Sequence, residues 1–433
     1  MLALVNVLGR LPKWRMPYST RAQSTRAALA FFMSAAAGVW AWYGPGHFSL
    51  LVALLPVLLW ACSANRWAAG AVMCAYMAAA GWPVPEAVAV FNGWPLPLTI
   101  ALYGAYSALY GAFWALLWHR SILWQALGLA LAFALLTVPP LGALYFASPA
   151  IAAGALFPGL GVLGIVATWA LVCTALVCVT ATARAREITP AGASSVGLCY
   201  LLALMATHQN TPTSAQIERE IPIRGIHTHF GEYPADPSER YQRHFELMAL
   251  VDSEMDAPGN AKVLLLPEGV AGLREPRVSW MWQEAGERAK AHGLTVAVGN
   301  SVVLEVAHGQ ASALVNQVEL FGEQSAQLRA LVDVPVGSWK PWAASGHYPA
   351  RWFEEPDQTE IDGVRIGAVM CWEELVAWPW LRHAGVGTTT LLAASNTWFD
   401  GGYIDAAQRR SSWALGRLFG INVVRAANTA RDR

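Results

Sequence analysis

The chain has 433 residues and a formal net charge of +0, with 55% hydrophobic and only 13% charged residues. Soluble domains carry about 25% charged residues, so an ordinary soluble protein is excluded, and the balanced charge gives no basis for nucleic-acid binding. The average hides a division, because between residues 27 and 183 only Arg66, Glu86 and Arg120 are charged, whereas charges recur every few residues from residue 218 onward. The length allows two domains, one suited to lipid and one to water.

Apolar segments before residue 208 predict a helical polytopic membrane domain over residues 1–207. A spanning helix needs about 20 mostly apolar residues, and these segments lack the polar face of a soluble helix because they are apolar all round. The basic N-terminus is followed by no small-residue cleavage site, so the first segment is predicted to be an uncleaved anchor. The seven segments are 27–43, 47–62, 67–82, 94–118, 121–146, 160–183 and 192–207.

Positive charges lie at alternate ends of these segments. They occur in the N-terminal region and in the turns near Arg66, Arg120 and Arg184, and the intervening turns carry none. By the positive-inside rule the N-terminus is cytoplasmic. Since seven spans are an odd number, the chain after the last span emerges on the other side. We therefore expect a multi-pass protein of the bacterial inner membrane whose polar half lies in the periplasm.

The pattern of the polar half predicts a linker followed by an α/β domain. Residues 208–220 (HQNTPTSAQIERE) are polar and rich in turn formers. Over residues 221–433, short apolar runs alternate with helical patterns, which predicts a buried sheet covered by helices. The predicted strands are 223–228, 262–266, 295–303, 363–370, 388–394 and 422–426, and the predicted helices are 241–255, 280–291 and 406–419.

Three residues in this domain are candidates for chemistry. Glu268 follows a buried strand and would lie at the rim of the sheet, where α/β sites form, although a plain loop carboxylate fits the same pattern. Cys371 comes directly after a strand and before a helical pattern, where backbone N–H groups favour a thiolate; a buried structural cysteine is the alternative. Lys340 lies between Trp339 and Trp342 and is either a partly desolvated cation or a surface lysine with a buried stem.

Together these residues suit one mechanism. A carboxylate takes the thiol proton, and the thiolate attacks a carbonyl carbon. A cation stabilises the tetrahedral oxyanion, and a thioester acyl-enzyme forms.

The order Glu268, Lys340, Cys371 resembles the Glu-Lys-Cys triad of the nitrilase superfamily, and the combination with a membrane half resembles apolipoprotein N-acyltransferase. The resemblance implies an α-β-β-α sandwich, with Glu268 as general base, Lys340 as oxyanion stabiliser and Cys371 as nucleophile.

Further motifs carry the same resemblance. Cys371-Trp372-Glu373 is similar to the family's Cys-Tyr-Glu, and residues 395–399 are similar to its Ser-Asn-Asp-Ala-Trp-Phe block, although one residue shorter. The match implies supporting roles for Glu373, Asn396 and Trp398, although Glu373 could instead cap the next helix. The segments that follow also agree: Gln408, Arg409, Gly416-Arg417 and residues 425–429.

The lysine region departs from the family, which follows its lysine with a Val-Pro-Phe-Gly-Glu block. If Lys340 is the triad lysine, that block is missing, and His347 stands near its place as either a site residue or a solvated loop residue. If Val334–Ser338 is the block, a serine replaces its glutamate and the lysine position falls near Arg329-Ala330, which breaks the triad. The TraB-type proteins of conjugative plasmids also resemble this plan.

The resulting expectation is acyl transfer, with a membrane phospholipid as acyl donor and an amine of an exported protein or peptide as acceptor. Two alternatives remain: an amidase that passes the acyl group to water, and a TraB-type assembly role without catalysis, beside the proteins of a conjugation apparatus. We expect no cofactor, no nucleic-acid partner and no metal, because His227 and His229, which alternate on a predicted strand, have no matching cysteine or acid set.

Overall fold

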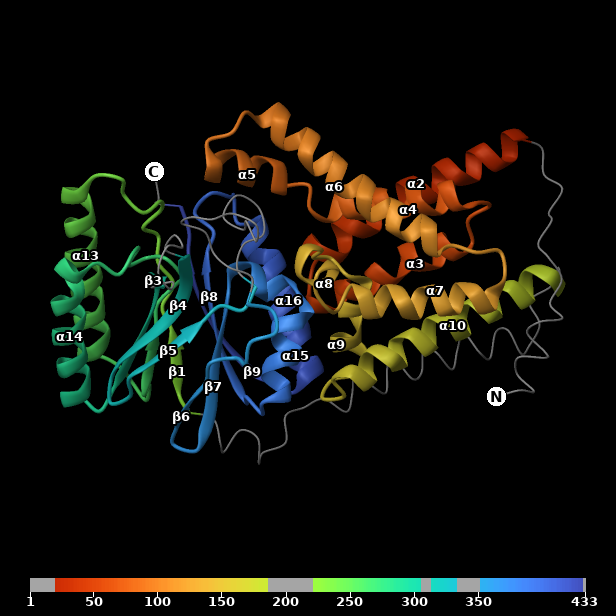
Figure 1. The fold of residues 1–433 in the computed structure, drawn as a ribbon. Coiled ribbons are helices and arrows are strands. Elements are labelled where there is room, and N and C mark those ends of the chain that lie inside the picture. Colours follow the sequence, from red (N-terminus) through yellow and green to blue (C-terminus); the bar gives the residue numbers. More distant parts are fainter. Residues whose placement is uncertain (1–19, 186–220, 305–312, 333–350, 431–433) are drawn as a thin grey trace. The chain divides into compact units, whose positions relative to one another are not determined.

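The computed structural model describes residues 20–185, 221–304, 313–332 and 351–430 (Figure 1). The chain divides into two compact units, a helical one and an α/β one. The first comprises Met1–Ala89, Gly93–Thr211 and Arg417–Phe419, and the second Val90–Asn92, Pro212–Gly416 and Gly420–Arg433. The predicted linker 208–220 lies outside the described residues, so the predicted domain limits remain a prediction.

Helices in the first unit overlap six of the seven apolar segments, and the seventh, 192–207, lies outside the described residues. The segment 121–146 was predicted as one span, which is wrong: its first helix ends at Leu135, shortly before Pro139-Pro140, where proline cannot continue a helix. The elements are α2 (Thr20–Tyr43), η1 (His47–Ala53), α3 (Leu54–Ala61), α4 (Arg66–Ala80), α5 (Val84–Asn92), α6 (Leu96–Leu117), α7 (Ile122–Leu135), α8 (Leu141–Leu144), η2 (Pro149–Ile151), α9 (Ala152–Leu156) and α10 (Val162–Ala185).

Among the described helices, α6 is long and apolar enough to cross a membrane, and α4 with α5, bent by 53°, would add a second span. Three apolar helices, His47–Ala61, Ile122–Leu135 and Val162–Cys178, are shorter. Core helices of soluble proteins meet the same criterion, so the seven-span membrane domain remains a prediction.

Helices α4 and α6 approach closely through glycine. A Cβ atom at Gly111 would lie 2.6 Å from the carbonyl oxygen of Gly70, and one at Gly70 would lie 2.9 Å from the carbonyl oxygen of Gly111. Small residues at a helix crossing allow the backbones to pack directly, as is common in membrane helices. The indole Nε1 of Trp60 donates to the Trp114 carbonyl oxygen at 2.9 Å, which adds a polar tie between α3 and α6.

Replacing Gly111 by leucine should therefore separate α4 from α6. We expect Gly111→Leu to destabilise the protein by about 1–3 kcal/mol, the usual cost of overpacking, measured as thermal stability in detergent. Gly104, on the same helix, has open space around its Cβ position, so Gly104→Leu is the matched control and should be neutral or slightly stabilising. Equal losses in the two variants would contradict the packing role of Gly111.

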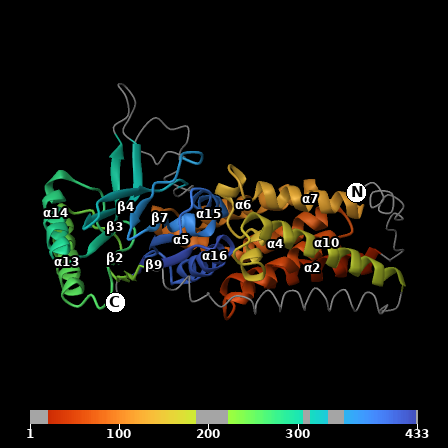
Figure 2. The same ribbon diagram turned by 90° about the horizontal axis from the view of Figure 1, so that it is seen from below.

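The second unit is a four-layer α-β-β-α sandwich. Helices α13 (Pro237–Asp256) and α14 (Pro276–Ala291) cover one sheet, and α15 (Ala377–Gly385) and α16 (Tyr403–Phe419) cover the other (Figure 1). Figure 2 shows the same order of layers. The first sheet has the order β1 (Ile223–Gly225), β2 (Val263–Leu265), β3 (Thr295–Leu304), β4 (Ala313–Gly322), β5 (Ala326–Arg329), and the second β6 (Thr359–Ile361), β7 (Val364–Met370), β8 (Thr390–Asn396), β9 (Asn422–Asn428).

In the first sheet β1 pairs with β2 and β2 with β3 in parallel, and in the second sheet β7 pairs with β8 and β8 with β9 in parallel. The remaining pairs are antiparallel. The six predicted strands and three predicted helices are confirmed, except that β1 ends at Gly225 and not at Thr228. His227 and His229 therefore lie beyond that strand. Strands β4, β5 and β6 were not predicted.

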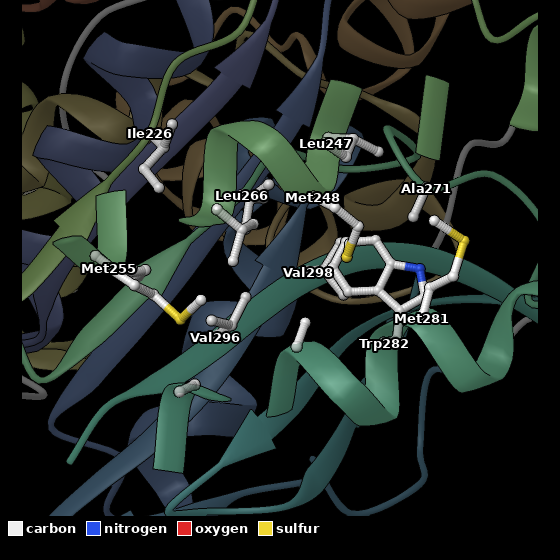
Figure 3. Close-up of a cluster of buried hydrophobic side chains, with 14 of the residues drawn as sticks. Ile226, Leu247, Met248, Met255, Leu266, Ala271, Met281, Trp282, Val296 and Val298 are labelled. Carbon is white, nitrogen blue, oxygen red and sulfur yellow. The ribbon is translucent and has the colours of Figure 1, made fainter. Parts of the chain in front are cut away.

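Two apolar cores hold the layers together. One lies between the sheets and includes Leu265, Ala368 and Leu392. The other fills the space between the first sheet and helices α13 and α14 and includes Leu247, Trp282 and Val298 (Figure 3). At its border Trp282 stacks on Phe321, with ring centroids 6.0 Å apart. The sandwich interior is thus apolar, and polar side chains inside it need a specific explanation.

Candidate active site

Residues after three parallel strands meet at one place in the sandwich. Glu268 follows β2, Cys371 follows β7, and Asn396 ends β8. The Glu268 carboxylate and the backbone N–H of Asn396 both lie close enough to the Cys371 thiol to shift its pKa. The predicted grouping of Glu268, Cys371 and Asn396 is therefore what the structure shows, at the strand ends where α/β sites form.

The nucleophile candidate Cys371 occupies a strained turn. Its φ angle is 46°, in the left-handed region that non-glycine residues avoid, and it begins the short 3-10 helix η3 (Cys371–Leu375). The amide Nε2 of the buried Gln408 donates to the Cys371 carbonyl oxygen at 3.0 Å and lies 3.7 Å from Sγ. Strained backbone of this kind persists only where its surroundings hold it, and it is common at functional sites.

Glu268 is buried and held by neighbouring strands. The amide Nδ2 of Asn316, on β4, donates to Glu268 Oε1 at 3.0 Å, and Ser301 Oγ donates to Asn316 Oδ1 at 2.6 Å. A Cβ at Gly299 would lie 2.4 Å from the Glu268 Cα, so only glycine on β3 lets the Glu268 turn lie this close. The strand neighbours thus fix the position of this carboxylate.

The surroundings of the thiol favour its neutral form. Burial raises the pKa of Cys371 well above its ordinary value, and the negative charges of Glu268 and Glu374 raise it further. The N–H of Asn396 lowers the same pKa but does not outweigh the other effects. A thiol in this setting loses its proton to an adjacent base during reaction and is not a standing thiolate.

Glu373 connects the nucleophile turn to the first sheet. Its Oε1 accepts from the backbone N–H groups of Leu331 at 2.6 Å and Val332 at 2.8 Å, and its Oε2 accepts from Met370 N at 3.0 Å. The N–H of Arg351 donates to the Leu331 carbonyl oxygen at 3.0 Å. Glu373 therefore ties the nucleophile turn to the first sheet's exit segment and caps η3, and its predicted site role remains a prediction.

The predicted residues Lys340 and His347 fall within 333–350 and so lie outside the described residues. The structure does describe the alternative lysine position. Arg329 Nε and Nη2 each donate to the Asp357 carboxylate at 2.8 Å. Ala330 is buried in the core between the sheets, and its N–H donates to the Asn316 carbonyl oxygen at 2.9 Å. In that register the lysine position falls on an alanine buried in the core and on an arginine whose charge is paired with Asp357.

The other predicted supporting residues differ in their contacts. Asn396 Oδ1 accepts from Asn428 Nδ2 at 2.9 Å, and its amide nitrogen would lie 3.1 Å from a Cβ at Gly269, the residue after Glu268. Trp398 packs edge-on against Phe399, with ring centroids 5.8 Å apart. Asn396 thus borders Glu268 and Cys371 directly, whereas the site role of Trp398 remains a prediction.

Sequence reasoning missed several polar residues around the pair. Asn316 and Glu374 were not singled out, and Gln408 and Arg425 were noted only as motif positions. Gln408 lies on a helix face with Asp405 and Ser412, and all three are buried. That i, i+3, i+7 spacing of polar residues on a helix was the available signal.

The histidines that were weighed as metal ligands have protein partners. His227 Nδ1 accepts from Ala427 N at 3.3 Å, and the His229 ring hydrogen-bonds Thr429 Oγ1 at 2.6 Å. Within the part of the chain that the structure describes, no three histidine, cysteine or acidic side chains are grouped as metal ligands would be.

Known proteins with similar sequences were also found. No family model matches the chain. The conjugal transfer protein TraB of Agrobacterium fabrum is 30% identical over 426 residues, covering 93% of each chain. The "Probable conjugal transfer protein TraB" of Sinorhizobium fredii is 28% identical over 391 residues, covering 89% of this chain and 94% of its own length.

Solved structures match less well. A variant of a Nesterenkonia amidase of the nitrilase superfamily aligns at 14% identity with a TM-score of 0.33, over 48% of this chain and 74% of its own. A second variant of that amidase, carrying acrylamide on its active-site cysteine, aligns at 14% identity and TM-score 0.33, over 48% and 77%.

The geometry predicts that removing the charge of Glu268 makes Cys371 react faster with an alkylating reagent. Because the Glu268 charge raises the pKa of Cys371, Glu268→Gln should lower that pKa and speed alkylation of Cys371 by iodoacetamide at neutral pH. The rate should be followed on the Cys371 peptide by mass spectrometry as a function of pH. The exposed carboxylate Glu284 on α14 supplies the control Glu284→Gln, which should leave the rate unchanged. A slower reaction in folded Glu268→Gln would show that the carboxylate does not oppose the thiolate.

Proposed function

The chain belongs to the TraB family of conjugal transfer proteins, and on this premise we propose that it is a membrane-bound, periplasm-facing acyltransferase of the nitrilase type. The observation that carries the proposal is the buried Glu268 carboxylate next to the Cys371 thiol on a strained turn. A structural cysteine needs neither a base nor strain.

The proposed chemistry uses this pair in both half-reactions. Glu268 takes the thiol proton as Cys371 Sγ attacks the acyl carbonyl carbon of the donor. Lys340 is proposed to stabilise the oxyanion. The tetrahedral intermediate collapses to a thioester, and the leaving alcohol receives the proton from Glu268. An amine then attacks the thioester, gives its proton to Glu268 and leaves as an amide, and the proton returns to the thiol sulfur.

The donor and acceptor are inferred from the plan of the chain. An apolar helical half in the same chain as a cysteine acyl-transfer domain suits a donor that resides in the bilayer, and a membrane phospholipid is the proposed donor. The proposed acceptor is an amine of an exported protein or peptide, and in this family the proteins of the conjugation apparatus are candidates. An amidase would use the same pair with water as acceptor.

A specific observation favours a second candidate, a non-catalytic assembly role in conjugation. In the register that aligns Val334–Ser338 with the family block, the lysine position holds the buried Ala330. The domain would then keep the sandwich without an oxyanion cation.

The acyl-enzyme is the direct test. When the acceptor is depleted, a phospholipid with a labelled acyl chain should leave label on Cys371, released by neutral hydroxylamine, absent in Cys371→Ser, and detected by mass spectrometry of protein purified from membranes. If no label appears while a short soluble amide is hydrolysed, the amidase function replaces the transferase. If neither reaction occurs and Cys371→Ala still supports conjugation fully, the assembly role replaces both.

The same assay decides between the registers. Lys340→Met should reduce acyl-enzyme formation by on the order of 10²–10³, the usual effect of losing one oxyanion donor. Lys290, the preceding lysine and an exposed residue at the end of α14, provides the control Lys290→Met. Equal rates in the two variants would remove Lys340 from the mechanism.

The proposed placement has its own test. Reporters fused after Thr207 should be active only outside the cytoplasm, and reporters fused near Arg120 only inside it. A cytoplasmic signal after Thr207 would overturn the periplasmic assignment and the lipid donor with it.

A further inference from the structure

The residue after Glu373 is a second buried carboxylate with a separate set of partners. Glu374 is completely buried, and its Oε2 accepts from Ser412 Oγ at 2.6 Å and from Arg425 Nε at 2.6 Å. The Ser395 hydroxyl donates to its Oε1. An ionised carboxylate removed from water is tolerated only with such partners, so this charge is compensated within the fold.

Helix α16 meets the nucleophile turn through one polar face. Its residues Asp405, Gln408 and Ser412 are buried. Gln408 donates to the Cys371 carbonyl oxygen at 3.0 Å, and Ser412 donates to Glu374. Asp405 Oδ1 accepts from Arg425 Nη1 at 3.3 Å. The guanidinium of Arg425, on β9, thus joins the helix to the turn.

We propose that Arg425 is a positioning residue for Cys371: its guanidinium compensates Glu374, so that the strained turn is held against α16 without an uncompensated negative charge beside the sulfur. The proposal rests on the proposed role of Cys371 as nucleophile. Arg425 itself contacts no reacting atom.

The charges around Arg425 support this role. Burial opposes its charge, but Glu374 and Asp405 together raise the pKa of Arg425, so it remains a cation. Asp405 also pairs with Arg409 at 2.7 Å. Burial lowers the pKa of His227, and the nearby Arg425 lowers it further, so this neighbour is neutral at pH 7. The Arg425 guanidinium is therefore the group that directly balances Glu374.

The sign of each substitution follows from the Coulomb interaction. Without the guanidinium, the Glu374 charge acts fully on the thiol and disfavours the thiolate. Without the carboxylate charge, the guanidinium favours the thiolate. Removing both returns the local charge near its starting value. A purely structural role for the network would not produce opposite signs, nor recovery in the double variant.

The test is the pH profile of Cys371 alkylation by iodoacetamide in the full chain in detergent. The chain has six cysteines, so the rate is measured on the Cys371 peptide by mass spectrometry. Arg425→Gln should move the midpoint up by about one pH unit and slow the reaction roughly tenfold at pH 7.5. Glu374→Gln should move the midpoint down, the double variant should lie near the wild type, and Arg425→Lys should retain the wild-type midpoint.

Arg274→Gln is the matched control. Arg274 forms an ion pair with the buried Glu319 at 2.7 Å. Glu319 lies opposite Val298 in the first sheet, on the face that α13 and α14 cover. The midpoint of Cys371 alkylation should therefore not move. Thermal melting confirms that each variant is folded.

An unchanged midpoint in folded Arg425→Gln, or a double variant no closer to the wild type, would overturn the proposal. If Arg425→Gln does not fold, Glu374→Gln decides alone, because an unchanged or raised midpoint there has the same consequence. The readout needs no acyl donor, so a failure of the acyl-enzyme assay would be distinguishable from a failure here.

Discussion

Two adjacent buried carboxylates hold the nucleophile turn, and the geometry of the site depends on them. Glu373 binds the backbone of Leu331 and Val332 in the first sheet's exit segment, whereas Glu374 binds Arg425 and Ser412 in the second sheet and its helix. Both carboxylates lie in the turn that begins at Cys371, whose backbone is left-handed. Because the partners lie on opposite sides, the strained backbone is fixed from both sheets, and the thiol stays beside Glu268.

Much of this arrangement could be predicted from the sequence. Parallel strands such as β2, β7 and β8 are continuous apolar runs, so the pattern placed Glu268 and Cys371 after strand ends, whereas Asn396 was chosen from the motif resemblance. Strand β4 was missed for the opposite reason. Its Gln317 and Glu319 are polar, but they are buried and hydrogen-bonded within the sheet, and a buried polar pair is invisible to a hydrophobic pattern.

The supporting residues could not be predicted because their roles depend on contacts across long stretches of chain. Asn316 reaches Glu268 across 48 residues of sequence, and Gln408 reaches Cys371 across 37, so both contacts exist only in the folded domain. The motif singled out Glu373 but not its partners, because these are backbone N–H groups that carry no side-chain signal. Lys340 was chosen because it is the only lysine in the sequence after Lys290 and fits the triad order, and it lies outside the described residues.

The charge balance of the site suits a nucleophile that is inert until substrate arrives. Thiolates react with oxidants far more readily than thiols do, and the periplasmic placement that we propose is an oxidising environment. Burial together with the charges of Glu268 and Glu374 raises the pKa of Cys371 and keeps it protonated. When an acyl carbonyl is bound beside the sulfur, attack on its carbon is coupled to transfer of the thiol proton to Glu268. The features that disfavour the resting thiolate therefore also confine its reactivity to the bound substrate.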